Sequence, residues 1–90
     1  MIIYVSTDKY SLKADFGLKY DHKDIGAYLR TLRLAKGWSM YQLAYKSCVR
    51  ESVIMRIEKG LRDPRLSTLL KIIDGLGISL AEFCQDFTKH

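Results

Sequence analysis

A chain of 90 residues is long enough for one compact domain, and with 48% hydrophobic residues it can form a core without disulfides or metals. Its two cysteines, Cys48 and Cys84, are too few for the disulfide framework of a small secreted protein, and their spacing fits no zinc site. This composition favours a cytoplasmic protein without a metal site. The net charge of +5 favours acidic partners.

The positive charge is concentrated in the middle of the chain. Residues 30–65 carry nine basic and three acidic side chains, whereas the charges nearly balance in residues 1–29 and 66–90. Such a distribution is typical of a protein face that contacts phosphate. A surface that is basic only for solubility explains the count equally well, so the charge alone leaves both interpretations open.

Residues 1–22 are predicted to form an N-terminal extension. Residues 2–5 are β-branched or aromatic, which favours a short strand. Because an isolated strand is marginal in water, it would have to pair within this segment or with a second chain. The apolar start is too short for a signal sequence or a membrane span, so we expect no membrane partner.

Residues 23–90 are predicted to form a domain of five short helices. The predicted helices span residues 24–36, 39–47, 51–59 and 66–76, and a last helix begins at Ser79. Asp24 is the predicted N-cap of the first helix, and S-x-x-Q and S-x-x-E capping boxes begin the second and the last. Gly37, Gly60 and Gly77 follow the ends of the first, third and fourth helices. Helical spacing predicts the inward residues Ile25, Tyr28, Leu29, Leu32, Ala35, Leu43, Ala44, Val53, Ile54, Ile57, Leu66, Leu69, Leu70, Ile73, Leu76, Leu80, Phe83, Cys84 and Phe87. Short connections between them indicate a compact all-α bundle.

The second and third predicted helices carry the functional signal. The turn at Cys48–Val49 is as short as a helix-turn-helix requires, and Ala44 is small where two helices must cross closely. The packing of Ile54 and Ile57 would leave four residues of the third helix facing outward, which are Glu51, Ser52, Met55 and Arg56. A helix held in this way on a basic scaffold can enter the major groove of DNA.

From about residue 25 to residue 87 the chain resembles the lambda-repressor-like helix-turn-helix domains of phage repressors, Cro-type proteins and small bacterial regulators. The matching motifs are Leu29-x-x-x-Arg33, Gly37-Trp38-Ser39, Leu43-Ala44, Val49, Ile54-x-x-Ile57-Glu58-x-Gly60, Pro64 and Leu76-Gly77-Ile78-Ser79-Leu80. Residues 43–47 also resemble restriction–modification controller proteins. The resemblance implies a five-helix DNA-binding domain of a transcriptional regulator that uses no cofactor and no small-molecule ligand.

The resemblance also assigns roles to individual positions. Arg33 and Glu58 match an internal ion pair that ties the recognition helix to the scaffold and would also direct Arg33 toward phosphate. The positions that match DNA-facing residues are Ser39, Met40, Arg50, Glu51, Ser52, Met55, Arg56, Lys59, Arg62 and Arg65. Among them, Arg56 is suited to bidentate contact with guanine and Glu51 to a cytosine amine.

Three positions depart from the family pattern. Met40 replaces the usual glutamine after the capping serine, which removes one hydrogen bond to DNA. Cys48 stands where the turn usually has glycine, so a residue with a side chain must adopt that backbone. Arg50 replaces the usual serine or threonine cap, which loses a cap worth about 1 kcal/mol. These departures put the details of DNA contact in doubt, and a chain that has lost DNA binding would show the same pattern.

Family members usually form homodimers through the last helix, which would place two recognition helices about 34 Å apart on a pseudo-palindromic operator. The apolar residues that suit this interface are Ile78, Leu80, Phe83 and Phe87. For Leu80 and Phe83, a place in the core of the single chain is an equally good interpretation.

Other functions are weighed against the same residues. Neither His22 nor His90 has an obvious sequence-local link to a cysteine, so an enzyme is not predicted. Cys48 is interpreted as a small packing residue. Trp38 is expected to cover the first turn of a helix. Tyr28, Tyr41 and Tyr45 could donate hydrogen bonds to phosphates, but partial burial is the more common role of such residues and is expected here. An antitoxin or protein-interaction module with the same fold is the alternative function. RNA binding is less favoured, because the chain lacks the aromatic platform of single-strand binders.

Overall fold

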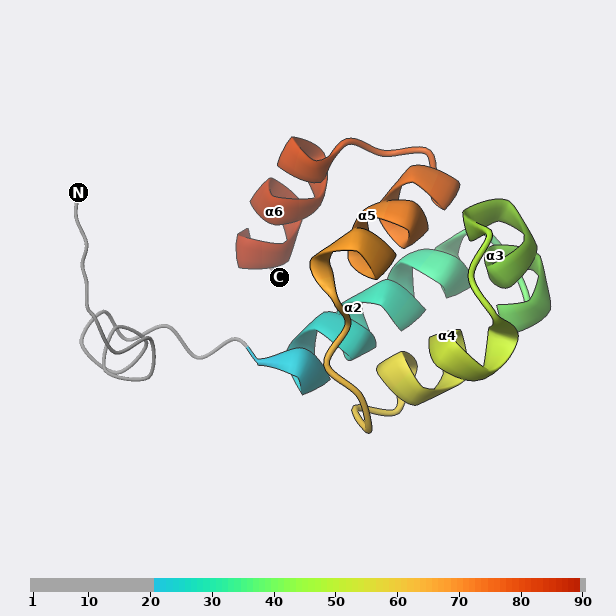
Figure 1. The fold of residues 1–90 in the computed structure, drawn as a ribbon. Helices are drawn as coiled ribbons and strands as arrows, with labels where there is room; N and C mark the ends of the chain where they lie inside the picture. The colour runs from blue at the N-terminus through green and yellow to red at the C-terminus, as the bar shows by residue number, and fades with distance from the viewer. Residues whose placement is uncertain (1–20, 90) are drawn as a thin grey trace.

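The computed structural model describes residues 21–89, so the strand expected near the N-terminus lies outside the described residues. Within the described range the chain forms five helices and no strand, as Figure 1 shows. The helices are α2 (His22–Ala35), α3 (Met40–Ser47), α4 (Glu51–Glu58), α5 (Leu66–Gly75) and α6 (Leu80–Lys89). The predicted all-α bundle is thereby confirmed, with helix ends within about two residues of the expected ones except at the start of α2.

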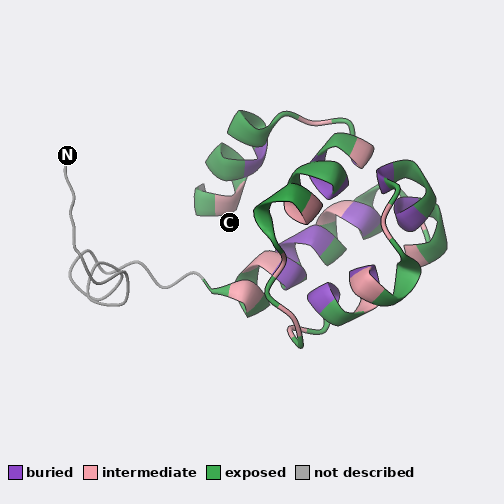
Figure 2. Cartoon of the chain, viewed as in Figure 1, coloured by how far each residue is buried: buried purple, intermediate pink, exposed green. Residues whose placement is uncertain are grey.

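Helix α2 crosses the middle of the view in Figure 1. Helix α4 packs on α2, while α3 packs against both α4 and α5, and α6 against α5. Each helix turns one apolar face to the centre and leaves its opposite face to solvent, which is visible in Figure 2 as buried segments on the inner sides of the coils.

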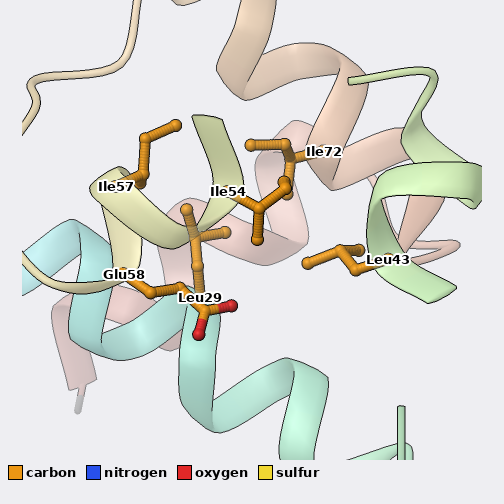
Figure 3. Close-up of a pocket in the computed structure, with 6 residues that line it drawn as sticks. All are labelled: Leu29, Leu43, Ile54, Ile57, Glu58 and Ile72. Atoms are coloured by element: carbon orange, nitrogen blue, oxygen red, sulfur yellow. The ribbon is translucent and has the colours of Figure 1, made fainter. Parts of the chain in front are cut away.

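The core joins residues from every helix. Its fully or nearly buried hydrophobic residues are Tyr28, Leu29, Leu43, Ala44, Ile54, Ile57, Ile72, Ile73, Leu76 and Phe83. Figure 3 shows five of them, together with Glu58, around a small space that is too narrow for a water molecule. This dense centre fixes how α4 is presented, because α4 supplies three of the six lining residues.

The inward face of α5 differs from the predicted one. Leu66 is 66% exposed and Leu70 39% exposed, whereas Ile72, which the pattern omitted, is completely buried. Six of the ten residues of α5, and the residue after it, are apolar or glycine, so apolar side chains lie on more than one face of the helix. The spacing of its leucines therefore does not identify the buried face. Packing against α3 selects the face that carries Ile72 and Ile73.

Helix α6 attaches to α2 through an aromatic cluster. The ring of Tyr28 lies 5.3 Å from that of Phe83 and 5.4 Å from that of Phe87, and the two phenylalanine rings stack 5.9 Å apart. Burial in this cluster, helped by the negative charge of Asp86, raises the pKa of the Tyr28 phenol. Cys84, predicted to face inward, is instead exposed.

The start of α2 corrects another prediction. The N-cap is Asp21, whose Oδ1 accepts hydrogen bonds from the amides of Lys23 and Asp24 at 2.9 and 3.2 Å. Asp24, predicted as the cap, lies three residues into this capping box, and its Oδ2 accepts from the amide of Asp21 at 2.9 Å. Asp21 acts as the N-cap and Asp24, three residues later, completes the capping box. The helix therefore begins about one turn earlier than predicted.

The predicted capping box of α6 is present and makes folding sensitive to acid. Glu82 Oε1 accepts from the Ser79 amide at 2.9 Å, and these bonds to Ser79 lower the pKa of Glu82. Because the folded-state pKa lies below the unfolded one, Glu82 contributes stability above the ordinary glutamate pKa, and the contribution is lost as the pH falls through the lowered value.

We expect the Glu82→Gln variant to lose this acid sensitivity, because glutamine keeps the box, as Gln42 does in α3, without titrating. The measurement is the urea midpoint of both proteins from pH 7 down to pH 3. The difference between them should shrink as the pH falls. Parallel curves over the whole range would contradict the prediction.

None of the described helices combines the length and the hydrophobicity that a membrane crossing requires.

Candidate DNA interface

Helix α3 begins at a complete capping box. Ser39 Oγ accepts from the amide of Gln42 at 3.1 Å, and Gln42 Oε1 accepts from the amide of Ser39 at 2.7 Å. The capped start, predicted from the S-x-x-Q motif, leaves the exposed amide end of α3 at the molecular surface. Met40, predicted as a DNA contact, is half-buried and packs against the core.

The turn between α3 and α4 spans only residues 48–50. Cys48 adopts the left-handed conformation, with φ 56° and ψ 39°, and the amide of Val49 donates to the carbonyl of Ala44 at 3.1 Å. Cys48 therefore adopts the left-handed conformation that glycine usually has in this turn, at a steric cost of about 1 kcal/mol. This conformation directs the Cys48 side chain to solvent, so the prediction of a packing residue was wrong.

Helix α4 turns one side to the core and the other outward. Ile54, Ile57 and Glu58 are buried. The outward side carries the exposed residues Glu51, Ser52, Arg56 and Lys59, while Met55 is half-buried. Arg50, the N-cap residue, makes no side-chain cap bond, so its guanidinium remains available at the start of the helix.

A buried ion pair anchors the end of α4. Arg33 Nε and Nη2 donate to the two carboxylate oxygens of Glu58, each at 2.8 Å, and Arg33 Nη1 donates to the carbonyl of Trp38, also at 2.8 Å. The side chains are 7% and 2% exposed. The hydrogen bonds to Glu58 raise the pKa of Arg33 against the opposing effect of burial. The guanidinium thus donates three internal hydrogen bonds and is almost buried, which does not favour the expected contact of Arg33 with phosphate.

Two glycines allow the helices of this unit to approach closely. A Cβ on Gly26 would collide with the carbonyl oxygen of Ile57, so α2 and α4 touch backbone to backbone. A Cβ on Gly75 of α5 would likewise collide with Ser47 of α3. The hydroxyl of Ser47 is buried there and has no hydrogen-bond partner among the described residues. Both contacts fix the orientation of the α3–α4 unit.

The remaining predicted positions divide by exposure. Arg65 is exposed at the N-cap of α5, and Arg62 is half-buried in the preceding loop. Of the predicted dimer residues, Leu80 is 44% exposed, whereas Phe83 is 3% exposed within the single chain. Phe83 therefore belongs to the core and offers no surface to a partner. Ile78 and Phe87 are half-buried against the core.

The two tyrosines of α3 are more exposed than the sequence predicted. Tyr41 is 65% and Tyr45 76% exposed, although both were expected to be partly buried. Their spacing could have revealed them, because Leu43, Ala44 and Ser47 define the inward side and leave positions 41 and 45 opposite. Trp38 is half-buried as expected, and the Nζ atoms of Lys36 and Lys46 lie 5.1 and 5.5 Å from the centre of its ring.

The described residues contain no group of three or more histidine, cysteine or acidic side chains that could hold a metal ion. The outward side of α4 is a surface of charged and hydroxyl side chains, formed by its exposed residues. A short helix, a three-residue turn and a second helix in this arrangement define a helix-turn-helix unit.

Comparison with known proteins agrees with this geometry. Residues 29–83, more than half of the chain, match the Helix-turn-helix family. Two crystal structures are similar: the restriction–modification controller protein C.Esp1396I, with a TM-score of 0.72, 29% identity, and coverage of 76% of this chain and 87% of that one, and the controller C.AhdI from Aeromonas hydrophila, with a TM-score of 0.66, 37% identity, and coverage of 69% and 94%.

Similar sequences occur in regulators of several bacteria. An uncharacterized HTH-type transcriptional regulator of Haemophilus influenzae is 45% identical over 53 residues, which are 59% of this chain and 54% of the relative. The regulator SutR of Escherichia coli is 34% identical over 55 residues, 61% of this chain and 31% of the relative. A regulator of Mycobacterium tuberculosis is 38% identical over 53 residues, 59% and 21%. The chain thus spans about half or less of these relatives.

The fold and the outward recognition helix define a DNA-binding regulator domain. More closely, this chain belongs to the lambda-repressor-like helix-turn-helix family.

Proposed function

We propose that the chain is a sequence-specific transcriptional regulator that binds a pseudo-palindromic DNA operator as a homodimer. The observation that carries the proposal is the outward side of α4, held rigid by the buried ion pair between Arg33 and Glu58. A rigid helix with exposed polar side chains in its N-terminal half fits the major groove, where base edges are distinguishable.

Base reading is assigned to three exposed residues of α4. The Arg56 guanidinium can donate to both O6 and N7 of guanine, Glu51 can accept from the amine of cytosine, and Ser52 can bond to a base or a phosphate. Phosphate binding is assigned to the basic residues beside them and to the amide end of α3, that is, to Arg50, Lys59, Arg62, Arg65 and Ser39.

Dimer formation is assigned to the surface at the start of α6, where Leu80 is exposed and Ile78 half-buried. A two-fold contact there would place two copies of α4 in successive major grooves, about 34 Å apart. Sedimentation measurements test the dimer, and selection of bound sequences from a random duplex pool tests the preference. A selected pool without a two-fold related motif would overturn the proposal.

We expect Arg56→Ala to weaken binding of the selected operator by about 1–3 kcal/mol for each half-site and to relax the preference at one base pair of each half-site. The measurement is the dissociation constant for the operator and for its variants at that pair, at one fixed salt concentration. Arg30→Ala, which removes an exposed arginine of α2, is the control and should bind normally. Unchanged affinity and preference in Arg56→Ala would refute this contact.

Lys59→Ala is expected to act differently, because a phosphate contact carries no base information. Affinity for all duplexes should fall by a similar factor. The slope of log K against log salt should flatten by about 0.9 for each lost contact, or roughly 1.8 in a dimer. Lys71→Ala on α5 is the matched control. A loss confined to the operator would assign Lys59 to a base instead.

A further inference from the structure

An open pocket lies beside the recognition helix, between α3 and the start of α4. It has a volume of about 510 Å³, and its lining includes Tyr41, Tyr45, Cys48, Arg50 and Glu51. Its rim is formed by the two tyrosines, one turn apart on α3 and 65% and 76% exposed. The contacts proposed above use the first residues of α3 and α4, but they leave Tyr41 and Tyr45 without a role.

The pocket has the chemistry to bind a chain of phosphates and sugars. Neither Tyr41 nor Tyr45 forms a hydrogen bond through its hydroxyl within residues 21–89. A phenol donates to an anionic oxygen, while its ring packs against an apolar surface such as deoxyribose. Arg50, freed from any capping bond, adds a positive charge on the α4 side of the pocket.

The position of the pocket points to one occupant. Arg50 and Glu51 belong to both the pocket and the first turn of α4. When the N-terminal half of a recognition helix enters a major groove, the preceding helix crosses the backbone that borders that groove. Tyr41 and Tyr45 lie on that preceding helix and line one pocket with Arg50 and Glu51, so a strand that borders the groove would pass within reach of both tyrosines.

We propose that this pocket binds the sugar–phosphate backbone of duplex DNA at the border of the groove that α4 enters, with the Tyr41 and Tyr45 hydroxyls as phosphate donors. This inference rests on the proposed function. The two tyrosines set the position of α4 along the groove, and they contribute affinity without reading bases.

The test combines Tyr41→Phe and Tyr45→Phe with DNA in which single phosphates of the operator are replaced by neutral methylphosphonates. Both phenyl rings stay in place, and neither tyrosine is buried, so the fold is retained. A homodimer loses one hydrogen bond in each half-site, and one bond corresponds to about two- to tenfold in affinity. Each variant should therefore bind the unmodified operator about four- to a hundredfold more weakly. At the contacted phosphate, neutralisation should weaken the wild-type protein more than the matching phenylalanine variant.

Cys48 allows an independent test of whether DNA occupies the pocket, because its exposed thiol belongs to the lining. In a Cys84→Ser protein, the operator should slow the reaction of Cys48 with a maleimide at least several-fold more than an equal concentration of unrelated duplex does.

The possible failures are distinguishable. If wild-type protein prefers no duplex, the proposed function falls, and this inference with it. If the operator is bound selectively but phenylalanine variants match wild type at every phosphate and Cys48 is not protected, the function stands and this inference is overturned. That second outcome would leave the pocket to a protein partner.

Discussion

Glu58→Gln is expected to lower the free energy of unfolding by about 3–5 kcal/mol, because it leaves the Arg33 guanidinium buried without a counter-charge. Arg33→Met should cost a similar amount for the converse reason, and it also removes the bond to the Trp38 carbonyl. The measurement is equilibrium denaturation in urea. A single domain usually has only about 5–15 kcal/mol of stability, so either change approaches unfolding.

The double variant Arg33→Met with Glu58→Leu separates charge from geometry. If the cost of the single variants comes from an unpaired buried charge, the double variant should be more stable than either single variant. Operator affinity of the double variant should remain below wild type, because α4 loses its only described charged tether to α2. A double variant that loses the sum of both single effects would show that the charges themselves are not the cause.

Gly26→Ala is expected to destabilise the protein by about 3 kcal/mol, although alanine is the better helix former by about 1 kcal/mol. The added Cβ would lie 3.0 Å from the carbonyl carbon of Ile57 and closer still to its oxygen. These are backbone atoms, which cannot rotate away, so α2 and α4 would have to separate. Thermal unfolding should show a Tm about 12–24 °C lower for a domain of this size.

Arg30→Ala in the same helix is the control, since its side chain is exposed, and its Tm should change little. Gly26→Ala should also weaken operator binding at temperatures where it is still folded, because the displaced backbone carries α4. A Tm equal to or above that of wild type would mean that the two helices can move apart without cost.

Much of the candidate interface follows from local sequence signals. The capping boxes at Ser39 and Ser79, the glycines after the helices and the three-residue turn each act over a few residues, so they predict helix ends without knowledge of the fold. The buried ion pair followed from the family resemblance, which supplied the long-range pairing of two positions 25 residues apart.

Other features depend on partners that are distant in sequence. The leucines of α5 fit several faces, and only packing against α3 selects Ile72 over Leu66. From the sequence, Phe83 fits a core position and a dimer contact equally well. The structure places its ring 5.3 Å from that of Tyr28 in α2, which assigns Phe83 to the core. A glycine such as Gly26 carries no side chain, so its neighbour cannot be inferred from its own residue type.

The sequence by itself determined the five helices, all of their ends but the start of α2, and the outward charged side of α4, because hydrogen bonding, capping and helical spacing are local. Only the tertiary structure decided which apolar residues are buried and how closely α2 and α4 approach. It also decided that Arg33 forms internal hydrogen bonds and that Tyr41 and Tyr45 are exposed. Those outcomes depend on the distances between helices, which steric fit sets across the whole core.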